Sequence, residues 1–484
     1  MVAMTATEWI TQRETHIAVV LLVGDRAYKL KKPVDMGFLD FSTRAKRLAA
    51  CRREVELNRR LPPDVYLGVA DVLGPDGEPC DHLVVMRRMP DKRRLSALVR
   101  AGEPLTDTIR QLARLIAAFH SNARTDAEVS VDGGRDAIQA RWRASFDQVR
   151  ATAHQLVGAD EIAEVEQLAM EFLAGRESLF ESRIEGKRIV DGHGDLLADD
   201  IFCLHDGPRV LDCLEFDDHL RWLDGLDDAA FLAMDLERLG APLLADQFLR
   251  DYLEFAGDRA PMSLINHYLA YRAFVRVKVA CLRRDQGDDT AATQAREYAE
   301  IAGRHLRAGR VRMILVGGLP GTGKSTVATK LANALGAVPL STDRIRKEIN
   351  GLSAMDSSAT GYQQGIYTPE HTERTYAELR HRAEMLLAQG ESVVLDASWT
   401  CATNRVLAAQ VARRTHSQLV EIRCDAPASL AAKRIQTRAA NASDADPRTA
   451  AHMATDADAW PNAVALDTTK TIGETVADAL TALG

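Results

Sequence analysis

The sequence lacks the cysteine spacings that mark zinc sites or disulfide frameworks. Its seven cysteines are scattered along the chain, and no pair has the CxxC spacing. An odd number of isolated thiols fits a reducing compartment. We therefore expect free cysteines in a cytoplasmic protein.

Long apolar runs are also missing. Residues 17–23 form an apolar run, but a helix that crosses a bilayer needs about 20 apolar residues. Charged and polar residues flank this run, and no small-residue cleavage site follows it. We interpret it as a buried strand rather than a signal peptide, and we expect no membrane span.

A surplus of basic residues is absent as well. The net charge is -8, from 61 Lys and Arg against 69 Asp and Glu. Residues 311–484 contain 18 of each kind, which leaves 43 basic against 51 acidic residues in the rest. Neither part has the excess expected of a general nucleic-acid binder. We therefore expect a small polar substrate, and the neutral charge of residues 311–484 argues against a nucleic-acid partner for that part.

A chain of 484 residues is too long for one core, because single cores stop growing near ~250–300 residues. Residues 1–90 are rich in predicted strands, and residues 91–308 in predicted helices. From residue 309 onward strands and helices alternate, which is typical of a mostly parallel sheet. We predict two domains, 1–308 and 309–484, and the first consists of a sheet-rich lobe and a helical lobe.

The predicted strands place the motifs. In the first domain we expect a strand–turn–strand unit over residues 15–32, strands at 71–73 and 83–86, and a strand pair at 188–191 and 210–213. In the second domain we expect strands at 311–316, 337–340, 392–396 and 419–424.

A glycine-rich turn follows the first of these later strands and opens a predicted helix. It matches the pattern GxxxxGK[ST] in full. Backbone N–H groups of such a turn point at phosphate oxygens, and the helix dipole adds attraction. We expect ATP and Mg²⁺, with Lys324 on the β- and γ-phosphates and Ser325 on the metal; the alternative is a chance glycine-rich turn. The nucleotide-binding positions are Gly318, Leu319, Pro320, Gly321, Thr322, Gly323, Lys324, Ser325 and Thr326.

Charged residues after the neighbouring strands indicate what the turn does. Asp343 could accept the proton of an acceptor hydroxyl, and Arg346, one helical turn on, could hold the acceptor. Asp396 ends another strand, where it could hold water on Mg²⁺. Arg434 and Arg438 share one helix face and could clamp phosphate. The plain alternatives are a helix cap at Asp343, a structural hydrogen bond at Asp396 and solvated arginines.

With these residues in place, residues 312–445 resemble the polynucleotide kinase, zeta toxin and gluconate kinase group of small P-loop kinases. The resemblance implies transfer of the ATP γ-phosphate to a hydroxyl. It makes Asp343 the base, Arg346 the acceptor contact and Arg438 a transition-state clamp.

A second acidic centre lies in the first domain. His193 and Asp195 belong to a His-Gly-Asp segment, and Asp200 and Asp212 follow it. Asp195 could accept a hydroxyl proton while His193 fixes its loop. Asp200 and Asp212 could share Mg²⁺, which prefers oxygen ligands.

Residues 20–300 resemble the aminoglycoside phosphotransferase branch of the protein-kinase-like fold through this segment. The resemblance implies that Lys29 contacts the α- and β-phosphates and that Glu54 is its partner, although Lys31 lies on the same strand face. It makes Asp224 the brace of the catalytic loop. The sequence departs from the family in two ways: Asp200 replaces the usual Asn, and no Gly-rich loop precedes Lys29.

The whole chain resembles bifunctional proteins in which an aminoglycoside-phosphotransferase-like domain precedes a P-loop kinase domain. We expect an ATP-dependent kinase of small hydroxylated molecules with two nucleotide sites. The alternative is a regulatory P-loop ATPase whose first domain is a ligand-sensing pseudo-kinase. Arg272 and Arg276 share a helix face, and if they line the acceptor cleft the substrate is anionic or neutral rather than an aminoglycoside.

Overall fold

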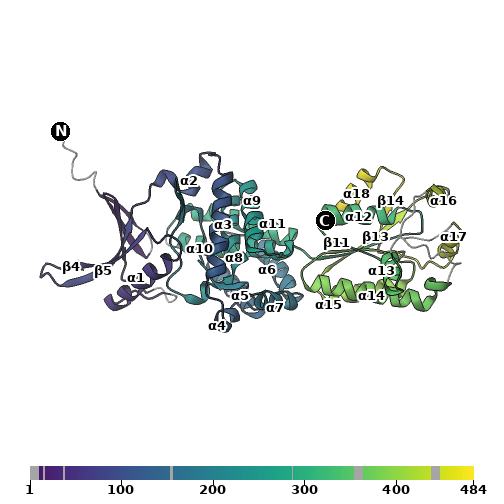
Figure 1. Cartoon of the computed structure of the whole chain (residues 1–484), viewed down its shortest axis with the longest axis horizontal. Helices are drawn as coiled ribbons and strands as arrows, with labels where there is room; N and C mark the ends of the chain where they lie inside the picture. The colour runs from purple at the N-terminus through teal and green to yellow at the C-terminus, as the bar shows by residue number, and fades with distance from the viewer. Residues whose placement is uncertain are drawn as a thin grey trace. The chain divides into compact units, whose positions relative to one another are not determined.

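The computed structural model describes residues 10–14, 17–35, 39–152, 156–285, 287–353, 364–437 and 447–483 (Figure 1). The chain divides into two compact units. The first unit comprises Met1–Glu166, Phe180–Ala260 and Ile265–Leu306; the second comprises Gln167–Leu179, Pro261–Leu264 and Arg307–Gly484. Within the described ranges, no helix is both long and apolar enough to span a bilayer.

The first unit begins with a five-stranded antiparallel sheet in the order β1-β2-β3-β5-β4. Strand β1 was not expected, and β4 and β5 are longer than predicted. Helix α1, which lies between β3 and β4 in the chain and is capped by Thr43, packs on β5 and β4. The bounds are β1 Ile10–Glu14, β2 Ala18–Val23, β3 Arg26–Lys31, α1 Arg44–Asn58, β4 Tyr66–Leu73 and β5 Pro79–Arg87.

Helices make up most of the rest of this unit. Two small sheets interrupt them: β6 (Ile189–Asp191) pairs with β9 (Trp222–Asp224), and β7 (Ile201–Leu204) with β8 (Gly207–Val210). The helices are α2 Leu95–Arg100, α3 Thr106–Asn122, α4 Ala127–Val131, α5 Arg135–Thr152, α6 Ala159–Ala174, α7 Glu177–Glu185, α8 Gly225–Arg238, α9 Pro242–Ala256, α10 Met262–Asp285 and α11 Ala291–Ala308; α6, α7, α10 and α11 also supply residues to the second unit.

The predicted pairing of residues 188–191 with 210–213 is wrong. The chain leaves the strand after Val210, because Asp212 adopts a left-handed backbone with φ 65°, which a regular strand does not allow. Segment 188–191 finds its partner in β9 instead. Asp212 therefore lies in the segment after β8 rather than in a strand.

The second unit contains a five-stranded parallel sheet in the order β11-β12-β10-β13-β14. Helices α12 and α18 cover one face, and α13, α14 and α15 cover the other (Figure 1). Strand β14 was not predicted. The strands are β10 Arg312–Gly317, β11 Val338–Ser341, β12 Val393–Asp396, β13 Gln418–Asp425 and β14 Val464–Asp467; the helices are α12 Lys324–Leu335, α13 Thr342–Ile349, α14 Pro369–Ala388, α15 Ala402–Arg414, α16 Ala428–Thr437, α17 Pro447–Thr455 and α18 Ile472–Thr481.

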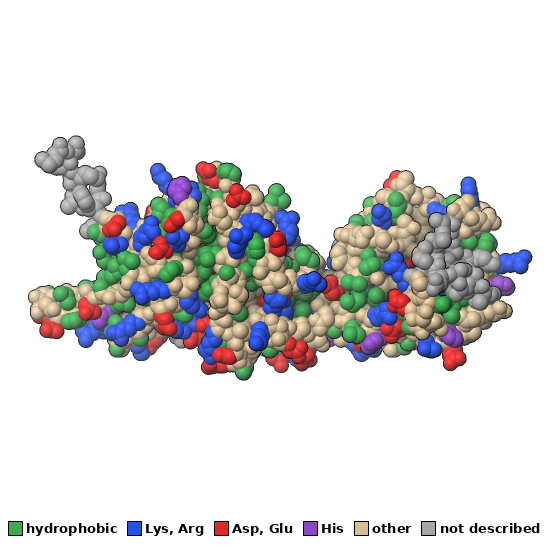
Figure 2. All heavy atoms as spheres, in the orientation of Figure 1, with side chains coloured by type: hydrophobic (Ala, Val, Ile, Leu, Met, Phe, Trp, Pro, Cys, Tyr) green, Lys and Arg blue, Asp and Glu red, His purple; other side chains and the backbone are tan. Residues whose placement is uncertain are grey.

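The predicted fold class is confirmed for both parts. The first unit has the small sheet lobe and helical lobe of a protein-kinase-like α+β fold, and the second is an α/β P-loop fold. On the face shown in Figure 2, Lys and Arg side chains are interspersed with Asp and Glu over the first unit.

Candidate active sites

The turn between β10 and α12 packs closely against neighbouring backbone at two glycines. Gly318 has φ 138°, and a Cβ atom there would lie 2.6 Å from the carbonyl oxygen of Cys424. Gly321 has φ 84°, and its Cβ would lie 2.4 Å from the carbonyl oxygen of Ala431. Helix α12 begins at Lys324 with no capping side chain. The N–H of Thr326 donates to the carbonyl oxygen of Gly323, but those of Lys324 and Ser325 precede it at the helix start and can bind an anion.

A cavity of about 650 Å³ opens at this turn. Its wall includes Asp343, Asp396 and Arg434, which come from three different elements. It thereby brings these predicted residues together with five from the turn and helix start, namely Gly321, Gly323, Lys324, Ser325 and Thr326. Gly318, Leu319, Pro320 and Thr322 shape the turn without lining the cavity, and Arg346 does not line it either.

Asp396 and Ser325 fit a divalent cation. Both side chains line the cavity, and burial raises the pKa of Asp396 although Lys324 and Ser325 oppose the shift. Oδ1 of Asp396 is buried and has no hydrogen-bond partner within the described part of the chain. A desolvated carboxylate oxygen beside a hydroxyl is the kind of ligand that Mg²⁺ takes together with phosphate oxygens and water. These residues would hold the metal, whose charge would neutralise the phosphates.

Asp343 and Arg346 lie together on α13. Nη1 of Arg346 is 3.4 Å from Oδ1 of Asp343, and its guanidinium lies 4.7 Å from the centre of the Tyr367 ring. Arg346 is 7% exposed, and its Nε has no hydrogen-bond partner among the residues that the structure describes. The pair is thus held in place with donor capacity unused. Arg438 lies outside the described residues.

One residue of this site was missed. Thr468 follows β14, and its Oγ1 donates to the carbonyl oxygen of Thr322 at 2.6 Å. Its own carbonyl accepts from Nη2 of Arg434 at 2.7 Å. Thr468 therefore joins the turn to helix α16. The sequence offers only a weak signal for it, the Asp-Thr-Thr segment after the short strand β14, which was not predicted.

In the first unit, Asp228 holds the predicted catalytic loop, which is the segment His193–Asp195. Its Oδ2 accepts from the N–H of His193 at 2.6 Å and its Oδ1 from the N–H of Gly194 at 3.0 Å. Nε2 of His120 contacts Oδ2 at 3.0 Å. Burial alone would raise the pKa of Asp228, but the bonds from His120 and His193 hold it well below its usual value. His193 itself is fully buried, and burial lowers its pKa.

We expected Asp224 to brace the catalytic loop, but the structure gives this role to Asp228. Asp224 is the N-cap of α8, where its carboxylate accepts from the N–H of Leu226 and pairs with Arg183 at 2.7 Å. Both oxygens of Asp224 accept hydrogen bonds, from Leu226, Arg183 and Tyr268, and none of these partners belongs to the loop. Asp228 lies one turn further along the same helix, and it is fully buried.

We expect Asp228→Asn to destabilise the first unit by about 3 kcal/mol, because removing one partner of a buried charge network leaves the others uncompensated. The midpoint of urea unfolding, followed by tryptophan fluorescence, measures this loss. Asp246→Asn is the control: Asp246 is exposed on the neighbouring helix α9, so its change should stay within about 0.5 kcal/mol. Equal stability of the two variants would contradict the bracing role.

Two lysines share the carboxylate of Glu54. Nζ of Lys29 lies 2.9 Å from Oε1 and Nζ of Lys31 lies 2.7 Å from Oε2. Lys29 also contacts Oδ1 of Asp212 at 2.5 Å, whereas Lys31 pairs with Glu215. Burial opposes the charge on Lys29, but Asp212 and Glu54 raise its pKa well above the usual value. Lys29 thus contacts the segment that carries Asp212. Lys31 is more completely buried than Lys29.

The three predicted carboxylates of this site have unequal proton affinities. Burial raises the pKa of Asp195 to about 6, against Arg276 and with support from Asp212. Burial, Asp212 and Asp195 raise the pKa of Asp200 well above its usual value. The described residues contain no group of three or more His, Cys, Asp or Glu that could hold a metal on their own. Asp200 and Asp212 fit Mg²⁺ that also takes phosphate oxygens, as nucleotide-bound Mg²⁺ commonly does.

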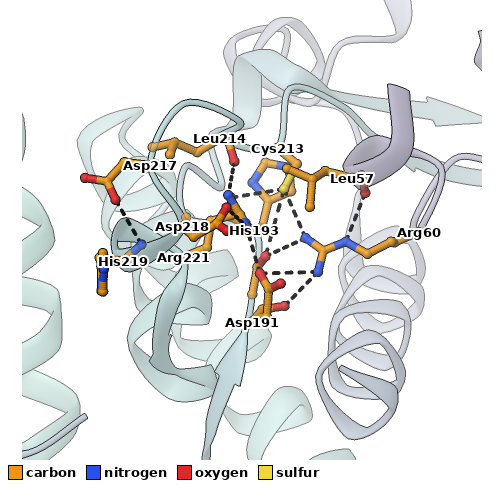
Figure 3. A network of polar contacts seen from close by, with 12 residues as sticks. Leu57, Arg60, Asp191, His193, Cys213, Leu214, Asp217, Asp218, His219 and Arg221 are labelled. Carbon is orange, nitrogen blue, oxygen red and sulfur yellow. Dashed lines mark hydrogen bonds and ion pairs between the residues drawn. The ribbon is translucent and has the colours of Figure 1, made fainter. Parts of the chain in front are cut away.

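Arg60 connects helix α1 to the catalytic loop (Figure 3). Its Nη1 donates to the carbonyl oxygen of Asp191 at 2.9 Å and its Nη2 to that of Gly192 at 2.8 Å. Nε of Arg221 bonds Oδ1 of Asp191 at 2.9 Å. The loop before Asp195 is therefore held from the sheet lobe as well as from the helical lobe.

Comparison with known proteins gives one family match in the second unit. A family model described as an AAA domain matches residues 313–459. Uncharacterised proteins of Mycobacterium bovis and Mycobacterium tuberculosis are 44% identical over 465 residues, which covers 96% of this chain and 93% of theirs. The chain belongs to the family of these mycobacterial proteins.

Two solved structures show a limited likeness to parts of this chain. A sugar kinase from Janibacter sp. HTCC2649 is 20% identical, with a TM-score of 0.30, and the match covers 36% of this chain and 94% of that one. A choline/ethanolamine kinase family protein from Mesorhizobium loti is 13% identical, with a TM-score of 0.38, and the match covers 61% of this chain and 90% of that one.

Proposed function

We propose that the protein is an ATP-dependent phosphotransferase that moves the γ-phosphate of ATP to a hydroxyl of a small molecule. The observation that carries the proposal is the cavity at the uncapped start of α12, where Lys324, Ser325 and Asp396 meet Asp343. Lys324 binds the β- and γ-phosphates, and Asp343 takes the proton of the acceptor hydroxyl. We keep Arg346 as the acceptor contact: it does not line the cavity itself, but it lies 3.4 Å from Asp343, which does, and its buried Nε has no partner among the described residues.

We propose a second nucleotide site in the first unit. Lys29, oriented by Glu54, contacts the α- and β-phosphates, and Asp195 is the general base. A base with a pKa of about 6 is mostly ionised at neutral pH and still accepts a proton readily. Asp200 and Asp212 hold Mg²⁺, which supplies positive charge to the phosphates.

We propose a small acceptor rather than a nucleic acid. The cavity of about 650 Å³ has the size of a small-molecule site. The formal charge of residues 311–484 is balanced, so the general attraction that drives phosphate-backbone binding is missing. The seven free cysteines, two of them exposed, fit a cytoplasmic location.

One observation favours the alternative for the first unit. Lys29 contacts Asp212 directly at 2.5 Å, and Asp200 adds a carboxylate where the related family has Asn. In this alternative the first unit binds a ligand without transferring phosphate, and it regulates an ATPase in the second unit.

The test is a screen of the full chain against a metabolite panel with ATP and Mg²⁺, followed by mass spectrometry for phosphorylated products. Wild type, Lys324→Ala and Asp195→Asn are compared. We expect acceptor-dependent ADP release in which each variant loses one set of products. Slow ATP hydrolysis that no acceptor stimulates would refute transfer, and activity unchanged in Asp195→Asn would favour the pseudo-kinase alternative.

A further inference from the structure

Two arginines on α10 differ in how far their guanidinium groups are hydrogen-bonded. Nε and Nη2 of Arg272 donate to the two oxygens of Asp227 at 2.7 and 2.8 Å, so this guanidinium is fully engaged. Arg276 lies one turn further along. Its Nε is buried and has no hydrogen-bond partner in the described part of the chain. A buried guanidinium edge with an unused donor is costly unless a ligand completes it.

The surroundings tie Arg276 to the catalytic loop. The ring of Tyr298 lies 6.0 Å from the guanidinium of Arg276 and 5.6 Å from that of Arg238. Arg238 donates to Oδ1 of Asp235 at 2.9 and 2.7 Å. Oδ2 of Asp235 accepts from the N–H of Ala198 at 3.0 Å, three residues after Asp195. One continuous set of contacts thus runs from the loop that carries the base to Arg276.

Arg276 and Asp195 influence each other without bonding. No ion pair joins these two side chains, both of which the structure describes, yet Arg276 is the strongest opposing charge to the burial that raises the pKa of Asp195. Arg276 therefore acts on Asp195 through its charge, while no ion pair with Asp195 occupies its guanidinium. The contacts through Tyr298, Arg238 and Asp235 link this unoccupied guanidinium edge to the loop that carries the base.

We propose that Arg276 binds an oxyanion of the acceptor, so that the first unit phosphorylates a hydroxylated anion that carries a carboxylate or phosphate group. The inference rests on the proposed function of this unit. The acceptor oxygen forms a bond to the γ-phosphorus, the bond from that phosphorus to the β–γ bridging oxygen breaks, and the hydroxyl proton passes to Asp195. The guanidinium edge supplies two parallel N–H donors to the oxyanion. Polycationic acceptors are repelled.

The experiment uses the full chain with Lys324→Ala, so that only the first unit transfers phosphate. Matched acceptors are offered: glucose against gluconate and glucose 6-phosphate, glycerol against glycerate and glycerol 3-phosphate, and kanamycin as the polycation. We expect ADP release with anionic members only, and the carboxylate and phosphate arms separate the two sources of the oxyanion. Arg276→Gln should raise KM for these acceptors about 10–100-fold, since a hydrogen bond to a charged group contributes about 1.5–3 kcal/mol.

Controls keep the test decisive. Arg284→Gln alters an exposed arginine on the same helix and should leave KM unchanged. Arg276→Lys keeps the charge without the planar fork and should give an intermediate KM, which covers the case in which Arg276→Gln fails to fold. Transfer to neutral or polycationic members with a KM that Arg276→Gln does not change overturns the inference.

Binding separates this inference from the proposed function. Equilibrium dialysis of gluconate and glycerol 3-phosphate is run with Mg²⁺ and a non-hydrolysable ATP analogue. If no acceptor is phosphorylated but one of these anions binds to wild type and not to Arg276→Gln, the anion site stands and transfer by the first unit fails. If neither anion binds to wild type, the anion site is refuted.

Discussion

Asp195→Asn should lower phosphoryl transfer by the first unit about 10²–10⁴-fold, the usual contribution of a general base. The amide keeps the size of the side chain but cannot accept the hydroxyl proton. The measurement is kcat in a Lys324→Ala background, where transfer by the second unit is silent. Asp206→Asn changes an exposed acid in the turn after β7, and it should retain full activity. Loss of activity in both variants would contradict a specific role of Asp195.

The pH dependence of the same reaction gives an independent check. Burial raises the pKa of Asp195 to about 6, Arg276 and Arg272 oppose this, and Asp212 and Asp235 add to it. Only the ionised base is active, so kcat/KM should rise about tenfold per pH unit below 6 and level off above 7. Arg276→Gln removes the main opposing charge and should move the midpoint to higher pH. A profile that is flat from pH 5 to 8 would exclude Asp195 as the base.

Lys324→Ala should reduce transfer by the second unit about 10²–10³-fold, the range seen when a preorganised electrostatic contact is lost. Lys324 opens α12 and lines the cavity, where its charge meets the developing charge of the phosphates. The variant should also lose magnesium-dependent ATP binding at this site. Calorimetry should therefore fall from two nucleotides per chain to one.

Lys330→Ala is the matched control for this variant, because Lys330 is an exposed lysine on the same helix. It should keep both the rate and the stoichiometry. Unchanged nucleotide binding in Lys324→Ala would remove the basis for a phosphate site at this turn.

The P-loop could be predicted from the sequence because its parts are contiguous. The strand, the turn and the helix start follow one another, and the glycines indicate directly where the backbone adopts positive φ. Thr468 could not be found in this way, because it reaches Thr322 from 146 residues away. Strand β14 has only four residues, of which only Leu466 is buried, so its pattern was too weak to recognise.

Side-chain partners were harder to predict than positions. Periodicity places Lys29 and Lys31 on one face, but their partners Asp212 and Glu215 are 183 and 184 residues away. In the same way, helical spacing puts Arg272 and Arg276 on one side of α10. Only the three-dimensional structure shows that Asp227 pairs with Arg272. It also shows that Nε of Arg276 has no hydrogen-bond partner among the described residues.

The sharing of Glu54 between two lysines bears on how the first unit could be switched off. When Lys29 turns from Asp212 toward a phosphate, Lys31 continues to neutralise Glu54, so helix α1 does not lose its anchor. Swinging α1 outward must break both ion pairs at once, and it would expose a carboxylate that is fully buried. Displacing this helix therefore has a large free-energy cost. An effector would act more readily on the contact between Lys29 and Asp212.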